Sequence, residues 1–433
     1  MPKIIVQQGY RQISEFDVPE GETTIGRSPD CDLTLARQGV SRVHLKIVRA
    51  GEVVTAEDLG SRNGTFLNGV PVTAPSQLKH MDVVQLGDTM LLYNELDSDN
   101  DDHTVHPTIE AESKTFDFAY VKRTVDAVRR NIAKVIQGKD EVIQRVLLAL
   151  LSDGHVLIED VPGVGKTMLA RALAKSIRTE FKRIQFTPDL LPTDVTGVNV
   201  YDEQSGQFTF IPGPIFGNVI LSDEINRGTP RVQSSLLECM SESKVTVDGR
   251  VHVLRKPFFV IATQNPVEFH GTYPLPEAQL DRFLMRLSVG YPEMAVEKDI
   301  LQSQMAAHPL NEISYVATAT EILQCQALVR TVHVSEPVKD YIVTIIDATR
   351  RHPAFPYGCS PRAALALMHA SQAQAASEGR DYVLPRDARD LAVHVLAHRL
   401  PLRLQARSEW ESTSAVVESI LAEFPLSKWE QNN

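Results

Sequence analysis

Residues 159–167, with the sequence EDVPGVGKT, nearly match a phosphate-binding loop. That pattern consists of a glycine, four further residues and then Gly-Lys-Ser or Gly-Lys-Thr. Gly165, Lys166 and Thr167 stand at the correct positions, whereas Asp160 stands where the first glycine is expected. In such loops the lysine reaches the β- and γ-phosphates of a nucleotide, and the hydroxyl binds magnesium. The segment therefore predicts a site for ATP and Mg²⁺ if the neighbouring sequence has the matching structure.

The sequence on both sides of the loop has the required order of strand, loop and helix. Residues 155–159, HVLIE, form a short apolar run that is typical of a buried parallel strand. Leu169, Leu173 and Ile177 recur every fourth position, which predicts a helix with one apolar stripe. Asp160 lies where the strand ends, before the loop closes on phosphate, so we expect an aspartate to be tolerated there. A glycine-rich turn that binds no nucleotide is the alternative interpretation.

Two further apolar runs end in polar residues that suit the same chemistry. Asp223 and Glu224 follow the run NVILS, and Asn265 follows the run FFVIAT. Ligands of an open α/β sheet bind beyond the carboxyl ends of its strands, so these ends should converge on one site. There Asp223 can hold magnesium through water, Glu224 can polarise the attacking water, and Asn265 can position that water. Without the phosphate loop, the Asp-Glu pair would indicate only a solvated loop.

The pattern along the chain predicts several domains, since 433 residues exceed what one core usually fills. Residues 1–95 alternate short β-prone runs with turn signals, as in an all-β sandwich. Residues 96–113 carry six carboxylates and no Lys or Arg, which indicates a flexible linker. Helices alternate with apolar runs over 114–292, as in an α/β core with a parallel sheet. Residues 293–433 are mostly helical, and we expect them to form a lid domain.

Composition excludes some classes of partner. The chain has 44 basic and 55 acidic residues, a net charge of -11, which argues against nucleic acid as a partner. The four cysteines are widely spaced without a CxxC pair, as is usual in a reducing compartment. The N-terminus does not resemble a secretory signal, and no apolar run approaches the roughly 18 residues of a membrane span. We therefore expect a cytoplasmic protein with no membrane insertion.

Residues 114 to about 430 resemble an AAA+ ATPase of the MoxR family. The resemblance is carried by VIQGKDEVI, VPGVGKTMLARALA, FTPDLLPTDVTG, FIPGPIFGNVILSDEINR, ATQNPVEFHGTYPLPEAQLDRFLMRL, GCSPRAAL and LPRDARDLAVHVLAHRL. It implies a hexameric ring that uses ATP and Mg²⁺. It also implies two β-inserts that face clients, around residues 186–214 and 244–257.

The resemblance also implies roles for individual residues. Thr167 and Asp223 would bind the metal, and Glu224, Asn265, Arg282 and Arg362 would act in catalysis. Arg282 corresponds to an arginine finger and Arg362 to the second sensor, while Arg286 is a rival for the finger. Whether Arg362 acts in its own subunit or in a neighbour is left open. The nucleotide would be bound by Asp160, Val161, Pro162, Gly163, Val164, Gly165, Lys166, Thr167 and Met168.

The N-terminal region resembles a forkhead-associated (FHA) domain, through TTIGRSPDCDLTL, GVSRVHLKI and DLGSRNGTFLNGV. Such domains bind phosphothreonine peptides, and a phosphate of about -2 charge needs charge-assisted donors. The resemblance implies that Arg27 and Ser41 contact the phosphate, that Arg62 or Arg42 assists, and that Asn63 holds the peptide backbone. We expect His44 to be a buried brace. A sandwich that binds no phosphate is the alternative.

Together these patterns predict a MoxR-type ATPase that remodels or matures a partner protein, recruited or regulated by phosphothreonine. The resemblance suggests help with metal insertion and a von Willebrand A-domain partner. One alternative is a phosphothreonine-dependent adaptor with little ATP turnover, and another is the motor subunit of a metal chelatase. Thr104 and Thr108 of the linker are candidate phosphorylation sites for the chain's own FHA domain. A spacer whose threonines are never modified is the other interpretation of that segment.

Overall fold

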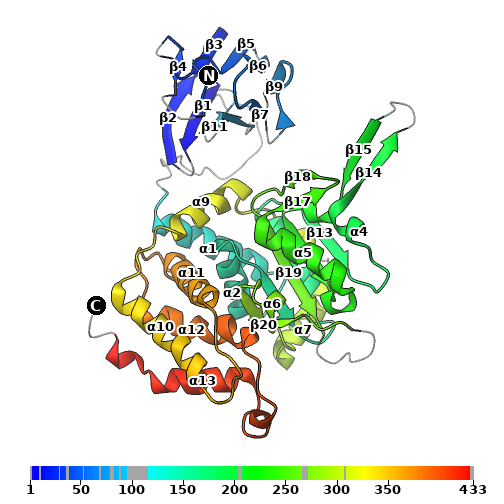
Figure 1. Cartoon of the computed structure of the whole chain (residues 1–433), viewed down its shortest axis with the longest axis vertical. Helices are drawn as coiled ribbons and strands as arrows, with labels where there is room; N and C mark the ends of the chain where they lie inside the picture. The colour runs from blue at the N-terminus through cyan, green and yellow to red at the C-terminus, as the bar shows by residue number, and fades with distance from the viewer. Residues whose placement is uncertain are drawn as a thin grey trace. The chain divides into compact units, whose positions relative to one another are not determined.

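The computed structural model divides into two compact units, residues 1–111 and 112–433 (Figure 1). The boundary falls inside the predicted linker, 96–113, which lies outside the described residues together with Thr104 and Thr108. The structure describes residues 2–429 except for 9–10, 29, 36–38, 52, 68–69, 79–81, 87–88, 95–115, 203–206, 266–271 and 307–308.

The N-terminal unit is a sandwich of two β-sheets, as predicted. The first sheet has the order β2-β1-β11-β10-β7-β8, formed by Arg11–Asp17, Lys3–Gln8, Thr89–Asn94, Val83–Leu86, Thr65–Leu67 and Val70–Pro71. The second has the order β4-β3-β5-β6-β9, formed by Leu33–Thr34, Gly21–Gly26, Leu45–Ala50, Val53–Asp58 and Ser76–Leu78. Alternate residues of the strands, such as Leu45 and Ile47, point into one core between the sheets.

The C-terminal unit contains a five-stranded parallel sheet with the order β13-β16-β19-β12-β20. These strands are Phe181–Gln185, Val219–Asp223, Phe259–Gln264, Val156–Glu159 and Met285–Leu287. The central strands are buried almost continuously because helices cover both faces of the sheet. Val156 and Ile158 pack with α1 (Phe118–Ala133), α2 (Asp140–Leu151) and α3 (Lys166–Ser176), whereas Leu157 packs with α5 (Pro230–Glu242).

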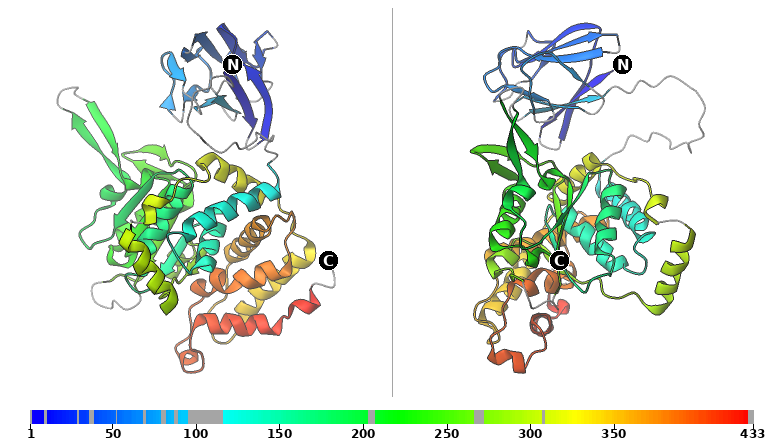
Figure 2. Two further views of the ribbon diagram at one scale, coloured as in Figure 1. Left: turned by 180° about the vertical axis from the view of Figure 1, so that it is seen from behind. Right: turned by 90° about the vertical axis from the view of Figure 1, so that its right-hand side faces the viewer.

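Two hairpins extend this core. One is formed by β14 (Gly197–Asp202) and β15 (Gln207–Pro212), which follow the short α4 (Pro192–Thr196) and project from the unit (Figures 1 and 2). The other is formed by β17 (Lys244–Val247) and β18 (Arg250–Val253). The ring of Phe210 stacks on His252 with centroids 4.2 Å apart, so the two hairpins contact each other. They occupy the two segments predicted as inserts.

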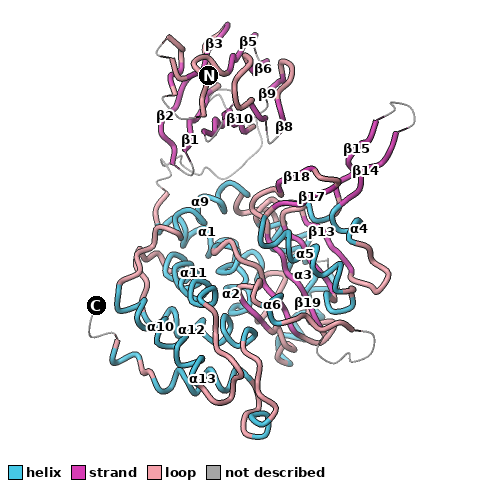
Figure 3. Tube along the Cα trace, viewed as in Figure 1, coloured by secondary structure: helices cyan, strands magenta, loops and turns pink. Residues whose placement is uncertain are grey.

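The remaining chain is helical, as predicted for the lid (Figure 3). Its helices are α7 (Met294–Ala306), α8 (Pro309–Glu312), α9 (Ala319–Val329), α10 (Glu336–Arg351), α11 (Pro361–Ser377), α12 (Pro385–Leu396) and α13 (Thr413–Glu423), and α6 (Glu277–Leu280) precedes β20. Short 3-10 turns are η1 (Pro214–Phe216), η2 (Ile225–Arg227), η3 (Ala397–Arg399), η4 (Gln405–Ser408) and η5 (Leu426–Lys428).

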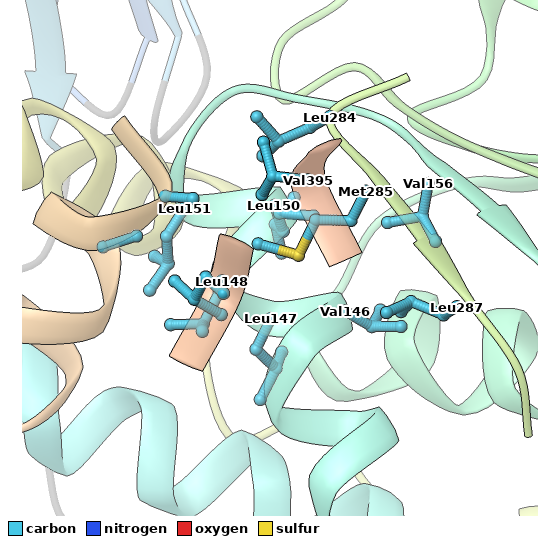
Figure 4. Close-up of a cluster of buried hydrophobic side chains, with 14 of the residues drawn as sticks. Val146, Leu147, Leu148, Leu150, Leu151, Val156, Leu284, Met285, Leu287 and Val395 are labelled. Atoms are coloured by element: carbon cyan, nitrogen blue, oxygen red, sulfur yellow. The ribbon is translucent and has the colours of Figure 1, made fainter. Parts of the chain in front are cut away.

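The helical lid and the α/β core share one hydrophobic cluster. Figure 4 shows part of it, where side chains of α2, including Leu147 and Leu150, lie with Met285 of β20 and Val395 of α12. All four of these side chains are almost fully buried. Because a buried apolar side chain contributes about 1.5–3 kcal/mol, this shared cluster holds the lid helices firmly against the sheet.

Candidate functional sites

The phosphate-binding loop lies between β12 and α3, in the predicted order of strand, loop and helix. Gly163 and Gly165 have φ values of 87° and 92°, which place both in the left-handed region that glycine adopts without strain. Gly165 immediately precedes α3, so backbone N–H groups of the loop gather at a helix N-terminus. This is the arrangement in which a polypeptide loop binds phosphate oxygens.

The loop forms one wall of a cavity of about 390 Å³. The ends of β16 and β19 form the opposite wall, so the three predicted strand ends do converge. The cavity is lined by Pro162, Gly163, Gly165, Lys166, Thr167, Met168, Arg183, Asp223, Glu224, Thr263, Gln264 and Asn265. Asp160, Val161 and Val164, which were expected to bind nucleotide, are not among these residues.

Thr263, which the sequence analysis did not single out, links the two acidic residues of this site. Its hydroxyl donates to Asp223 Oδ1 at 2.6 Å and accepts from the backbone N–H of Glu224 at 2.9 Å. Glu224 has φ 55°, a left-handed conformation that is unusual for a residue with a side chain. Strained backbone of this kind is concentrated at functional sites, where surrounding contacts hold it in place.

Strand β13 contributes two further side chains that the sequence analysis missed. Arg183 Nη2 lies 2.6 Å from Asp223 Oδ2, and Gln185 Nε2 donates to Glu224 Oε2 at 2.9 Å. The parallel pairing of β13 with β16 sets Gln185 beside Asp223, which brings these residues together. No local pattern in the sequence shows that β13 pairs with β16, so the sequence did not identify Arg183 and Gln185 as members of this site.

The side chains of the cavity fit a nucleotide with its magnesium ion. Lys166 is half-buried, and burial lowers the pKa of its ammonium group, although the nearby carboxylates of Asp160, Asp223 and Glu224 oppose that shift. A hydroxyl at Thr167 and a carboxylate at Asp223 are hard oxygen ligands of the type that magnesium prefers. The left-handed glycines leave space for phosphate beside the backbone, since a Cβ on Gly163 would meet no heavy atom within 4 Å.

Asp160 is 8% exposed and turns its carboxylate away from the cavity. Oδ2 accepts hydrogen bonds from Ser288 Oγ at 3.0 Å and from the backbone N–H groups of Val289 and Gly290, both at 2.6 Å. Burial raises the pKa of this carboxyl, but the hydrogen bonds outweigh burial and the net pKa is lowered. The carboxylate of Asp160, at the position of the expected glycine, is therefore ionised and accepts hydrogen bonds from Ser288, Val289 and Gly290.

Arg282 and Arg362 lie together in a second cavity, of about 320 Å³, and neither lines the nucleotide cavity of its own chain. Arg282 Nη1 donates to Leu237 O at 2.7 Å and to Ser241 Oγ, near the end of α5. Arg362 lies in the first turn of α11, as predicted, and its Nε is 4.0 Å from Asp281 Oδ2.

The rival finger, Arg286, is engaged elsewhere, because its Nη1 lies 3.0 Å from Glu159 Oε2 at the end of β12. Arg399, which the sequence analysis did not identify, lines the same cavity as Arg282 and is 7% exposed.

In the N-terminal unit, the five predicted phosphopeptide residues line one cavity of about 640 Å³. The backbone N–H of Arg62 donates to Ser41 Oγ at 3.0 Å, and Asn63 Nδ2 donates to Gly39 O at 2.9 Å. These contacts hold the loops on either side of the cavity at fixed positions. The complete lining is Arg27, Gly39, Val40, Ser41, Arg42, Arg62 and Asn63.

His44 is fully buried and contacts the backbone of Ser41, which lines this cavity. Its Nδ1 accepts from the backbone N–H of Ser41 at 3.0 Å, and its Nε2 lies 3.3 Å from Gly64 O. Burial lowers the pKa of the imidazole, while the Gly64 carbonyl and Asp58 oppose that shift. A neutral ring with its proton on Nε2 satisfies both contacts, so His44 is positioned to brace the two loops.

Comparison with protein families agrees with this architecture. Residues 155–285 match the family model described as "ATPase family associated with various cellular activities (AAA)", and residues 347–420 match an AAA lid domain. Residues 23–87 match an FHA domain. The fold and these matches define an AAA+ ATPase that carries an N-terminal FHA domain.

Individual relatives identify the family. The chain is 38% identical over 312 residues to chaperone MoxR1 of Mycobacterium tuberculosis, an alignment that covers 70% of this chain and 82% of that protein. It is 51% identical over 292 residues to YeaC of Bacillus subtilis, covering 67% and 91% of the two chains. The crystal structure of a candidate ATPase from Cytophaga hutchinsonii is similar with TM-score 0.67 and 38% identity, covering 71% and 96%. The chain belongs to the MoxR family of AAA+ ATPases.

Among the described residues, the structure contains no helix that is both long and apolar enough to cross a membrane.

Proposed function

We propose that this ATPase hydrolyses ATP with Mg²⁺ to remodel or mature a partner protein, which its FHA domain selects through phosphothreonine. The observation that carries the proposal is the cavity in which the phosphate-binding loop meets Asp223, Glu224 and Asn265. A site that only bound a nucleotide would need no more than the phosphate-binding loop. The added carboxylates and amide are the groups that activate and position a water for attack on phosphorus.

Each group of the cavity has a defined task in this proposal. Lys166 binds the β- and γ-phosphates, and Thr167 and Asp223 would hold magnesium, which neutralises charge on the phosphate oxygens when bound. Glu224 polarises the attacking water, and Asn265 orients it. Thr263 fixes the relative positions of Asp223 and Glu224, through the two hydrogen bonds of its hydroxyl.

The location of the two arginines supports their action on a neighbouring subunit. Arg282 and Arg362 share a cavity that is separate from the nucleotide cavity of the same chain. Their guanidinium groups would therefore complete the site of an adjacent subunit in a ring, which the family resemblance suggests is hexameric. Arginines placed at the γ-phosphate stabilise the charge that develops there during phosphoryl transfer.

The FHA cavity supports recognition of a phosphorylated threonine. Arg27, Arg42 and Arg62 line the same cavity as Ser41, so cationic and hydroxyl donors are available there together, as a dianionic phosphate requires. Asn63 lies beside them, where its side chain can also bind the peptide backbone.

The projecting hairpins support contact with a client. Tyr201, Phe208 and Ile211 of the first hairpin and Val253 of the second are 53%, 69%, 52% and 76% exposed. Apolar groups gathered in this way on a surface mark sites of interaction. The relative MoxR1 is named a chaperone. A von Willebrand A-domain protein as partner and help in metal insertion belong to the proposal on the family resemblance alone.

The test is steady-state ATP hydrolysis as a function of protein concentration, for the wild type, Glu224→Gln and Arg282→Ala. We expect turnover per subunit to rise with concentration in the wild type, because assembly supplies the arginines, and to be lost in both variants. The proposal would be rejected if the wild type bound ATP but hydrolysed it no faster than the two variants at every protein concentration. That result would favour a phosphothreonine-dependent adaptor whose assembly is gated by ATP.

A further inference from the structure

The segment that follows β20 is held by Asp160, where the nucleotide loop begins, and by Lys139, in the turn before α2. Asp160, the last residue before the loop proper, accepts three hydrogen bonds from Ser288, Val289 and Gly290 through one carboxylate oxygen. Lys139, in the turn before α2, donates from Nζ to Tyr291 O at 2.8 Å. The segment after β20 is thus bonded to the start of the phosphate-binding loop and to the turn before α2.

The same strand leads directly to the arginine cavity. Arg282 lies three residues before β20 and Ser288 lies one residue after it, so the strand spans the interval between the two sites. β20 pairs with β12 in the sheet, and Val289 is buried in the cluster that core and lid share. A change in the position of the 288–290 segment would therefore act on a strand of three residues that leads back to Arg282.

Asp160 also contacts the lysine of the phosphate-binding loop. Its backbone carbonyl accepts from Lys166 Nζ at 2.6 Å, so one residue touches both the phosphate-binding lysine and the end of β20. Hydrogen bonds to a carboxylate are about twice as strong as neutral ones. A glycine at this position, as the usual pattern has, would leave the N–H groups of Val289 and Gly290 without this acceptor, and an unpaired backbone donor destabilises the structure around it.

We propose that Asp160 is a positioning residue that couples the phosphate-binding loop of one active site to β20, and through β20 to the Arg282 that serves the neighbouring active site. This inference rests on the proposed action of Arg282 between subunits. It assigns the departure from the phosphate-loop pattern to communication between the sites of a ring, because the carboxylate of Asp160 binds the segment after β20 and does not line the nucleotide cavity.

The test uses the full chain with Asp160→Gly, Asp160→Asn and, as a matched control, Asp126→Asn in α1, where the half-buried Asp126 pairs with Arg129 outside both cavities. Affinity for a fluorescent ATP analogue and steady-state kcat are measured for each. We expect Asp160→Gly to retain the affinity within about threefold while kcat falls on the order of tenfold or more, since small misplacements of a catalytic group have effects of that size. Asp160→Asn keeps one acceptor oxygen and should show a smaller loss, and Asp126→Asn none.

Mixed rings separate action on a neighbour from action on the chain's own site. The Asp160→Gly chain, held at fixed concentration, is mixed with increasing Glu224→Gln chain, which cannot hydrolyse ATP but carries an intact Arg282. We expect hydrolysis per Asp160→Gly subunit to recover, because its own site is sound and its neighbour now supplies the finger. If Asp160→Gly does not fold, Asp160→Asn takes its place.

Failure to recover would overturn the proposal, and so would loss of ATP affinity in Asp160→Gly or a kcat equal to that of the wild type. The same mixing experiment with Arg282→Ala in place of Asp160→Gly tests the underlying function. If that mixture also fails to recover, Arg282 does not act between subunits, and the proposed function fails together with this inference. Recovery with Arg282→Ala but not with Asp160→Gly rejects the inference alone.

Discussion

Arg399 of the lid bonds to Asp281, the residue immediately before Arg282, with Nη1 2.7 Å from Asp281 Oδ1. Its other terminal nitrogen donates to Phe283 O at 2.7 Å, so the two contacts flank Arg282 on either side. Arg399 is 7% exposed, and its planar guanidinium binds both groups. A lid residue 118 positions after Asp281 thus fixes the backbone on both sides of Arg282, the proposed arginine finger.

For this reason we expect Arg399→Ala to destabilise the C-terminal unit by about 3 kcal/mol, as removal of one partner of a buried ion pair does. It should also lower kcat with little change in ATP affinity, because Arg399 does not line the nucleotide cavity. Urea unfolding and steady-state kinetics measure the two effects. Arg407→Ala, a change in the lid outside both cavities, serves as control, and equal stability of the two variants would contradict the prediction.

Thr263→Val should lower kcat about tenfold while the chain still binds ATP. Valine has nearly the shape of threonine but removes the hydroxyl that joins Asp223 to the Glu224 backbone, and a hydrogen bond to a charged group contributes about 1.5–3 kcal/mol. Thr263→Ser retains the hydroxyl and should keep most of the activity. Assays of phosphate release over time, with ATP binding measured in parallel, distinguish these outcomes. Similar rates of hydrolysis for the two variants would show that the Thr263 hydroxyl does not position Asp223 and Glu224 for catalysis.

Arg27→Ala and Ser41→Ala should each weaken binding of a phosphothreonine peptide by about 10- to 100-fold, the loss that follows from removing a hydrogen bond to a charged group. Both side chains line the FHA cavity. Lys46→Ala, which removes a cation paired with Glu22 and Glu57 outside that cavity, is the matched control. Calorimetric titration with phosphorylated and unphosphorylated forms of one peptide measures the effect. Binding that ignores phosphorylation would favour a sandwich that does not recognise phosphate.

We expect the C-terminal unit to lose stability in mild acid because the buried imidazole of His155 favours the neutral form. Burial lowers the pKa of its imidazole from 6.5 to about 4, with Nε2 3.1 Å from Met240 O and Nδ1 accepting from Val260 N at 3.2 Å. Because the folded pKa is the lower one, the unfolded chain binds more protons between these pH values. The stabilisation from neutral His155 is therefore present above about pH 6.5 and lost as the pH falls toward 4, with a maximum of about 3 kcal/mol.

The measurement is the free energy of unfolding from pH 7 to pH 4.5 in the wild type and in His155→Gln. The other titratable groups are the same in both proteins, so the difference between their two curves of unfolding free energy against pH isolates the contribution of His155. The variant should lose less stability than the wild type over this range, although it starts from a lower value. Parallel curves would exclude His155 as the source of the pH dependence.

Much of the nucleotide site was predictable because its groups stand at the ends of apolar runs. Lys166, Asp223 and Asn265 each follow such a run, and parallel strands end at one edge of a sheet. Thr263 had a weaker signal, since it is itself the last residue of the run FFVIAT. Arg183 and Gln185 had none, because only the pairing of β13 with β16 brings them to the carboxylates.

The sequence by itself determined the sandwich, the α/β core, the helical lid and the family, since apolar periodicity and short motifs are local properties. The tertiary structure decided which side chains share a cavity. It separated Arg282 and Arg362 from the nucleotide loop of their own chain, and it turned Asp160 from the loop toward the end of β20. Contacts of this kind depend on strand order and on packing between distant segments, and neither is encoded in the spacing of nearby residues.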